Sequence, residues 1–147
     1  MYNHLELMSI QADVLYLHNQ AGRMTTINEP MNQPAPRFFW GQTIAGRIVR
    51  FRSDVPDHLV HDILQLIDQG DSTVQLAKVI RALEKDKEIR SLWLGPAFTF
   101  QKNGKGAYSC YLGYGRPLYS TSWDNYASLS IAKRLDLHLY GTDISIY

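Results

Sequence analysis

The stretch from Pro117 to Tyr147 constrains the fold more than any other part of the chain, because it carries signals for a strand, a helix and a second strand in close succession. From Leu118 to Trp123 two sets of side chains alternate, which is the period of a strand. Ser122 or Asp124 can cap the helix that follows, which is predicted over 124–135. Its predicted buried stripe consists of Ala127, Ile131, Ala132 and Leu135. The β-rich run 140–147 then predicts a strand that pairs back onto the sheet.

Composition narrows the class of protein. The 147 residues suit one domain with a core of ordinary size, so we predict a single domain over 1–147. A net charge of +1 gives no reason to expect a nucleic-acid partner. No apolar run approaches the ~20 residues of a membrane span, and residues 1–8 lack the features of a secretion signal. We therefore expect a cytoplasmic protein with no membrane partner, and the single Cys110 excludes an intrachain disulfide.

The first two thirds of the chain predict further strands and two helices. Turn residues at 19–22 separate two β-prone runs, which predicts a hairpin, and a proline-rich loop covers 28–36. Strands are expected at 37–40, 47–52 and 89–100, with Gly41–Gly46 joining the first two and Gly95-Pro96 breaking the third. Apolar spacing predicts helices over 56–69 and 73–85. The predicted fold class is α+β, a mostly antiparallel, strongly twisted sheet with about three helices.

The C-terminal unit resembles a known enzyme family. Its strand–helix–strand order, with Asn125 at the start of the helix and Lys-Arg-Leu-x-Leu over 133–137, is similar to the C-terminal third of the GNAT family of acetyl-CoA-dependent N-acetyltransferases. More weakly, residues 13–52, the helix from Pro56 and Gly-Pro-Ala-Phe-Thr-Phe over 95–100 look like the N-terminal extension of one bacterial and fungal GNAT subgroup. The resemblance implies a partial GNAT-like fold, with 1–100 as the N-terminal region, 117–147 as the C-terminal unit, and part of the central acetyl-CoA core missing.

The resemblance also implies roles for single residues. Acetyl would pass from acetyl-CoA to an amine by direct attack, with Asn125 helping to hold the cofactor and Ser128 bordering it. The family's commonest proton donor, a tyrosine halfway along this helix, falls on Ala132, and the usual glycine at the helix exit is Asp136. A purely structural interpretation of Asn125, as a helix cap, stays open. No residue is assigned as the catalytic base.

The stretch from Gln101 to Gly106, Gln-Lys-Asn-Gly-Lys-Gly, has two interpretations. It matches the GNAT pyrophosphate loop, Gln/Arg-x-x-Gly-x-Gly/Ala, so by resemblance Gln101, Gly104 and Gly106 would hold acetyl-CoA through backbone N–H groups. Asn-Gly at 103–104 is also a strong hairpin turn. Only residues 107–116 separate the motif from the next strand, and a parallel crossover needs about a dozen residues or more. We favour the hairpin.

Two functions therefore remain open. The first is an N-acetyltransferase, active or inactivated by its shortened cofactor core, acting on an amine that the sequence does not identify. The second is a non-catalytic GNAT-derived protein whose exposed sheet edge pairs with a second copy or a separate partner. A helix over 101–116 favours the first and a hairpin favours the second. The pair His58 and His61 could face a metal, although a solvated helix face is the preferred interpretation.

Overall fold

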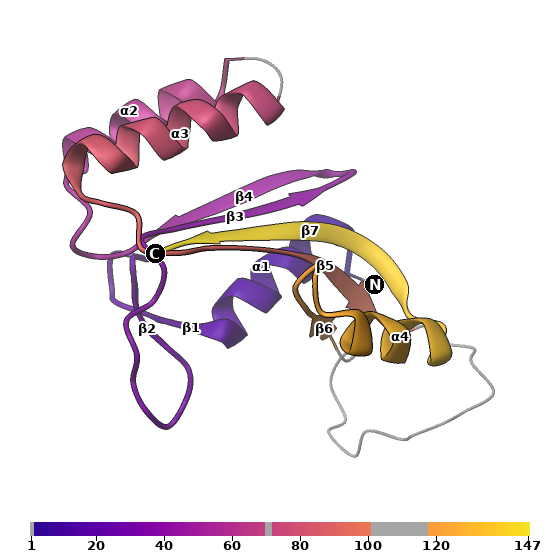
Figure 1. Ribbon diagram of the computed structural model, residues 1–147. Coiled ribbons are helices and arrows are strands. Elements are labelled where there is room, and N and C mark those ends of the chain that lie inside the picture. The colour runs from indigo at the N-terminus through magenta and orange to yellow at the C-terminus, as the bar shows by residue number, and fades with distance from the viewer. Residues whose placement is uncertain (1, 70–71, 101–117) are drawn as a thin grey trace. The chain divides into compact units, whose positions relative to one another are not determined.

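The computed structural model describes residues 2–69, 72–100 and 118–147 (Figure 1). In these residues the fold is α+β, with four helices, a two-stranded sheet and a mostly antiparallel five-stranded sheet, which confirms the predicted fold class. The elements in chain order are α1 (His4–Leu15), β1 (Tyr16–His18), β2 (Met24–Ile27), β3 (Phe38–Thr43), β4 (Gly46–Phe51), α2 (Asp57–Ile67), α3 (Ser72–Asp86), β5 (Leu92–Thr99), β6 (Leu118–Ser120), α4 (Tyr126–Arg134) and β7 (His138–Ile146). The three predicted helices correspond to α2, α3 and α4.

The chain divides into two compact units, each assembled from separated segments. The first unit comprises Met1–Leu15, Trp40–Val49 and Trp93–Ile144. The second comprises Tyr16–Phe39, Arg50–Leu92 and Ser145–Tyr147. The single domain over 1–147 stays a prediction.

Helix α1 of the first unit is missing from the sequence-based prediction, although its start carries a local signal. The backbone N–H of Asn3 donates to Oε2 of Glu6 at 2.7 Å, and the N–H of Glu6 donates to Oδ1 of Asn3 at 2.9 Å. This reciprocal pair is a capping box, which satisfies two otherwise free donors of the first turn. The helix buries Leu7, Met8, Gln11 and Ala12. A glutamine inside the buried face interrupts the apolar spacing by which a helix is recognised.

The five-stranded sheet has the strand order β4-β3-β7-β5-β6. The connection predicted over Gly41–Gly46 is wrong, because β3 continues to Thr43 and only two residues join it to β4. The Thr43 hydroxyl closes that turn: Oγ1 accepts the N–H of Ala45 at 3.1 Å and donates to the carbonyl of Gly46 at 3.0 Å. Gly46 has φ of 135°, a conformation that side chains disfavour. Such a short connection makes β3 and β4 antiparallel.

Two glycines in the sheet make room for α1. A Cβ built on Gly41 would lie 2.2 Å from Cγ of Met8, and one built on Gly141 would lie 2.7 Å from Cε of the same methionine. Met8 is fully buried. Helix α1 therefore packs against β3 and β7 at two glycines. The thioether of Met8 fills the space that a side chain at either glycine would occupy.

The strand break predicted at Gly95-Pro96 is wrong, because β5 runs unbroken from Leu92 to Thr99. It pairs antiparallel with β6, with Ala97 opposite Ser120 and Thr99 opposite Leu118. A Cβ on Gly95 would lie 1.7 Å from the carbonyl oxygen of Thr121, so only glycine permits this approach of two backbones. Tertiary pairing thus keeps in a strand two residue types that local propensity disfavours there.

The predicted hairpin is confirmed in the second unit. Strands β1 and β2 pair antiparallel, with Tyr16 opposite Ile27 and His18 opposite Met24. In the turn, Oδ1 of Asn19 accepts the backbone N–H of Arg23 at 3.0 Å, and Gly22 has φ of 75°. Asparagine and glycine supply what this turn needs, a local acceptor and a left-handed conformation.

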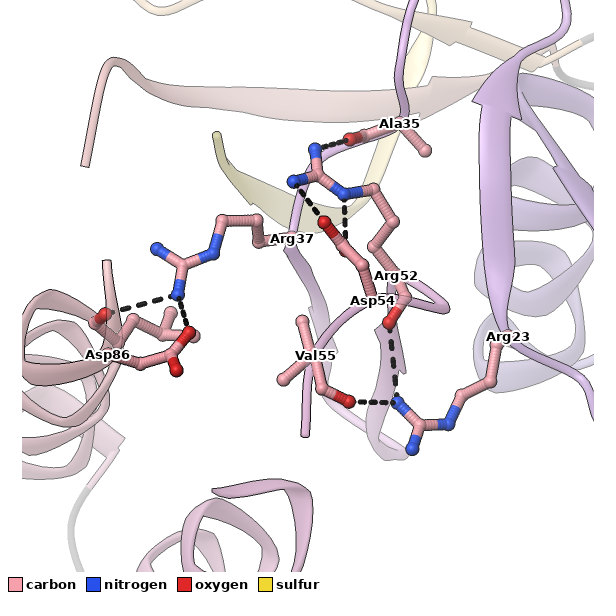
Figure 2. Close-up of polar contacts among 8 residues, drawn as sticks. Arg23, Ala35, Arg37, Arg52, Asp54, Val55 and Asp86 are labelled. Atoms are coloured by element: carbon pink, nitrogen blue, oxygen red, sulfur yellow. Dashed lines mark hydrogen bonds and ion pairs between the residues drawn. The ribbon is translucent and has the colours of Figure 1, made fainter. Parts of the chain in front are cut away.

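Three arginines of the second unit each bind a carboxylate and at least one backbone carbonyl. Figure 2 shows the carboxylates bound by Arg37 and Arg52 and the carbonyl of Val55 bound by Arg23. Arg37, 3% exposed, donates to the carbonyls of Leu83 and Lys87 and to Asp86 at 2.9 Å. The Leu83 carbonyl also accepts the backbone N–H of Lys87 at 3.0 Å, so Arg37 adds a second donor there and places its positive charge at the C-terminal end of α3. The other two arginines are Arg23, which binds Asp57, and Arg52, which binds Asp54.

Candidate functional site

The start of α4 is the described part of the region that resembles a cofactor site. Asn125 is the N-cap: its Oδ1 accepts the backbone N–H of Ser128 at 3.1 Å, and its carbonyl accepts the N–H of Leu129 at 3.0 Å. The carbonyl of Ser128 accepts a hydrogen bond from the Tyr119 hydroxyl at 3.4 Å. The structure thus brings Asn125 and Ser128 together, through a cap whose N–H groups point toward the start of the helix.

The cap prediction for Ser122 or Asp124 is wrong by a few residues. The hydroxyl of Ser122 donates to Oδ1 of Asp124, so these two side chains satisfy each other. The carbonyl of Ser122 accepts the N–H of Asn125 at 3.1 Å, and the N–H of Trp123 donates to the carbonyl of Leu94 in β5 at 3.2 Å. A tight polar turn that is hydrogen-bonded to β5 therefore precedes the helix, and the helix begins at Tyr126.

The exit of α4 is a Schellman motif. The N–H of Leu137 donates to the carbonyl of Ala132 at 3.0 Å, and the N–H of Asp136 donates to the carbonyl of Lys133 at 3.2 Å. Asp136 has φ of 51°, which is the left-handed conformation that the residue after such a helix adopts. The position where the resemblance expects glycine is thus a position whose backbone favours glycine.

The predicted buried stripe of α4 is mostly wrong. Ile131 and Leu135 are 46% and 45% exposed, and Ala127 is also exposed. The face that turns inward carries Ala132, 2% exposed, with Ser128 and Leu129 half-buried. On that side of the helix, the carbonyl of Ser128 accepts a hydrogen bond from the Tyr119 hydroxyl of β6. The inward face is therefore displaced by about one residue from the predicted stripe. The residue in the place of the family's proton donor is therefore a packed methyl group.

The other predicted cofactor residues, Gln101, Gly104 and Gly106, lie outside the described residues. The choice between a pyrophosphate loop and a hairpin over 101–116 falls on the same part of the chain. Both assignments rest on the sequence.

The first unit contains a group of buried, hydrogen-bonded polar side chains that the sequence did not predict. The amide of Gln11 donates through Nε2 to Oδ2 of Asp143, and its Oε1 accepts the hydroxyl of Tyr140. These three residues are 3%, 0% and 3% exposed, in the order Gln11, Asp143, Tyr140. The ring of His4 lies 6.3 Å from that of Tyr140, centroid to centroid. An aspartate inside the β-rich run 140–147 was the available signal, since a strand interior disfavours this residue type.

Burial shifts the pKa values of the two titratable residues in this group, Asp143 and Tyr140. It raises the pKa of Asp143 from 3.8 to about 7, while the Gln11 hydrogen bond works in the opposite direction. It also raises the pKa of Tyr140, and the charge on Asp143 adds to that increase. Oδ1 of Asp143 has no hydrogen-bond partner among the described residues. A carboxyl group with these properties holds a proton near neutral pH, at a place that solvent does not reach.

The described residues give no support to a metal site. No group of three or more His, Cys, Asp or Glu side chains in that part of the chain is arranged to hold an ion. Nε2 of His61 lies 3.1 Å from Nε2 of Gln65, one turn along α2, and His58 is exposed. The solvated helix face stays the preferred interpretation. No helix in the described residues is long and apolar enough to cross a membrane.

Comparison with known proteins adds no further assignment. No family model, no curated protein and no solved structure matches the chain. The resemblance to GNAT enzymes therefore depends on the residues of this chain alone.

Proposed function

We propose that the chain is a cytoplasmic GNAT-like N-acetyltransferase, which transfers acetyl from acetyl-CoA to an amine. One observation carries the proposal: Asn125 caps a helix, α4, that follows strand β6 and precedes strand β7. This is the order and the cap position on which the resemblance depends. The Schellman exit at Asp136 supports it, because the conformation there suits the glycine that the family usually has.

In this proposal the start of α4 is the anion site for the cofactor. The positive end of a helix dipole favours phosphate, and α4 presents that end at Asn125. The N–H groups of Tyr126 and Ser128 already donate within the turn, to the carbonyl of Asp124 and to Oδ1 of Asn125, so the dipole is the main attraction. In the proposed complex Ser128 borders the cofactor, and Gln101, Gly104 and Gly106 hold its pyrophosphate if the loop interpretation is right.

The reaction would need little from the protein beyond positioning. The amine nitrogen attacks the thioester carbonyl, the C–N bond forms, the C–S bond breaks, and the thiolate of CoA leaves with the bonding electrons. The amine then loses a proton and the thiolate gains one. Since Ala132 has no acidic proton, water would protonate the thiolate, and we expect slow transfer.

Binding of acetyl-CoA, measured by isothermal titration calorimetry, tests the proposal. The informative variant is Asn125→Asp, which keeps a capping oxygen but adds a negative charge beside the phosphates. At ~5 Å and a dielectric constant between 20 and 80, repulsion from one phosphate charge is about 1–3 kcal/mol, so affinity should fall about fivefold or more. Asp124→Asn is the matched control, because Asp124 is engaged by Ser122 rather than by the cap.

The outcomes separate a cap from a ligand site. Saturable binding that Asn125→Asp weakens while the urea midpoint is unchanged supports the proposal. Binding that Gly104→Asp also weakens extends it to the pyrophosphate loop. No binding at millimolar acetyl-CoA by the folded protein contradicts the enzyme assignment for the isolated chain.

A second candidate is a non-catalytic GNAT-derived protein that self-associates. Two neighbouring apolar side chains of α4 favour it: Ile131 and Leu135, one turn apart, are 46% and 45% exposed. A second copy of the chain could cover this apolar pair. Sedimentation velocity tests this: a concentration-dependent dimer that Ile131→Lys abolishes supports the candidate, and a monomer at all micromolar concentrations excludes it.

A further inference from the structure

An open groove of about 800 Å³ lies between α2 and α3, both in the second unit. Figure 1 shows the two helices side by side. The amide of Gln75 donates to the carbonyl of Gln69, which ties the beginning of α3 to the end of α2. Each of the two helices also has a fully buried side chain, Ile63 in α2 and Leu83 in α3.

The α3 wall of the groove is cationic. It carries Lys78, Arg81 and Lys85, all exposed, at spacings of three and four residues. One helical face therefore presents three positive charges over ~10 Å of helix axis. None of the three forms an ion pair within the part of the chain that the structure describes.

Carboxylates do not cancel this charge. Asp86 lines the groove but is held by Arg37 at 2.9 Å. Asp62 is the other carboxylate in the lining, so the described lining carries two more positive than free negative charges.

The α2 wall supplies two side chains, His58 and Gln65, that can donate hydrogen bonds to an anion. The carboxylate of Asp62, on the same wall, is the one free negative charge counted above. Leu59 and Leu66 add apolar surface to the same wall.

We propose that this groove binds an extended phosphate-bearing anion, a condensed phosphate chain that is free or part of a nucleoside triphosphate. A row of three cations matches several linked phosphates better than one compact anion, since each phosphate meets its own charge. The volume lies within the ~300–1,000 Å³ typical of small-molecule sites. The groove belongs to the second unit, whereas α4 lies in the first, so the inference is independent of the acetyltransferase proposal.

The test is calorimetric titration of the whole chain with inorganic tripolyphosphate and, separately, with adenosine triphosphate, both without metal. The double variant Lys78→Gln/Arg81→Gln removes two charges from the groove. Lys133→Gln/Arg134→Gln removes the same charge from the last turn of α4 and is the matched control. We expect the groove variant to bind at least tenfold more weakly, and the control to bind within twofold of the wild type.

Each outcome decides the matter. Equal affinity for the two probes assigns the site to the phosphate chain, and tighter binding of adenosine triphosphate assigns it to a nucleotide; both support the inference. No binding of either probe at millimolar concentration overturns it, as does equal weakening in both variants, which would mean non-specific attraction. The groove variant should keep any affinity for acetyl-CoA, so failure here and failure of the acetyltransferase proposal are distinguishable. Unchanged urea midpoints show that the exposed substitutions leave the fold intact.

Discussion

Substituting Asp143 by asparagine tests the physical reasoning about the first unit most directly. The side chain is fully buried, accepts a hydrogen bond from Gln11 through Oδ2, and has no partner for Oδ1 among the described residues. Asparagine has nearly the same shape and can still accept the hydrogen bond from Gln11, but it never ionises. The substitution therefore removes one property, the titration, and leaves the packing almost unchanged.

The size and the sign of the effect follow from the pKa of Asp143. Burial raises that pKa from 3.8 to about 7 in the folded protein. Between these values the folded state binds a proton that the unfolded state has lost, so the free energy of unfolding falls as pH rises. At ~1.4 kcal/mol per pH unit, the loss from pH 4 to pH 7 is about 4 kcal/mol, and it levels off above pH 7. That is a large part of the ~5–15 kcal/mol that stabilises a typical domain.

Urea denaturation followed by tryptophan fluorescence, from pH 4.5 to pH 8.5, measures this. Because other groups also titrate, the informative quantity is the difference in unfolding free energy between Asp143→Asn and the wild type. We expect that difference to be small at pH 4.5 and to rise to about 3–4 kcal/mol in favour of the variant at pH 8. Asp13→Asn is the matched control, since it makes the same chemical change at an exposed position of α1.

One result would refute the reasoning. If the difference between Asp143→Asn and the wild type stays constant across this pH range, the carboxyl group does not change its protonation between pH 4 and pH 7. The burial argument would then be wrong. A variant that is less stable by a constant amount would show instead that the carboxylate is ionised in the fold and well satisfied.

Three further substitutions test other contacts, each by urea denaturation at pH 7. Gly95→Ala should lower the free energy of unfolding by more than ~3 kcal/mol, because the new methyl group would overlap a backbone carbonyl. Gly22→Ala should lower it by only about 1 kcal/mol, because φ is 75° there and a Cβ would meet nothing within 4 Å. Equal losses would contradict the close approach of the two backbones at Gly95. Asp136→Gly should stabilise by about 0.5–1 kcal/mol, since φ is 51° there, and a loss of stability would contradict the Schellman exit. Arg37→Lys should cost about 2 kcal/mol because an ammonium cannot serve two carbonyls and a carboxylate in the same geometry, while Arg134→Lys on an exposed turn should change little.

Local signals predicted the elements that depend on local chemistry. The hairpin turn was found because an asparagine and a glycine together supply an acceptor and a left-handed backbone at Asn19 and Gly22. Helices α2 and α3 were found because their apolar residues recur at helical spacing. Helix α1 was missed because Gln11 lies in its buried face. The capping box of Asn3 and Glu6 can be found in the sequence, but two residues alone do not predict a helix without an apolar stripe after them.

What the sequence could not supply are contacts between distant residues. The partner of Asp143 is 132 positions away, so nothing near the aspartate indicates that its charge will be desolvated. The unbroken course of β5 through Gly95 depends likewise on the backbone of Thr121. In α4 the spacing of apolar residues was right for a helix, but it did not indicate which side faces inward. The inward side carries Ser128, whose carbonyl accepts a hydrogen bond from Tyr119, a contact between elements that apolar spacing does not encode.

The position of β7 has a consequence for how the polypeptide comes to fold. This strand lies between β3 and β5, although the ribosome makes it after both of them. Until residues 138–146 have emerged, β3 and β5 have no central strand to pair with, and their hydrogen-bonding edges stay available to other nascent chains. Pairings between such distant segments also form slowly. We therefore expect the first unit to fold only after β7 has left the ribosome, and its yield in cells to depend on chaperones that hold the earlier strands apart.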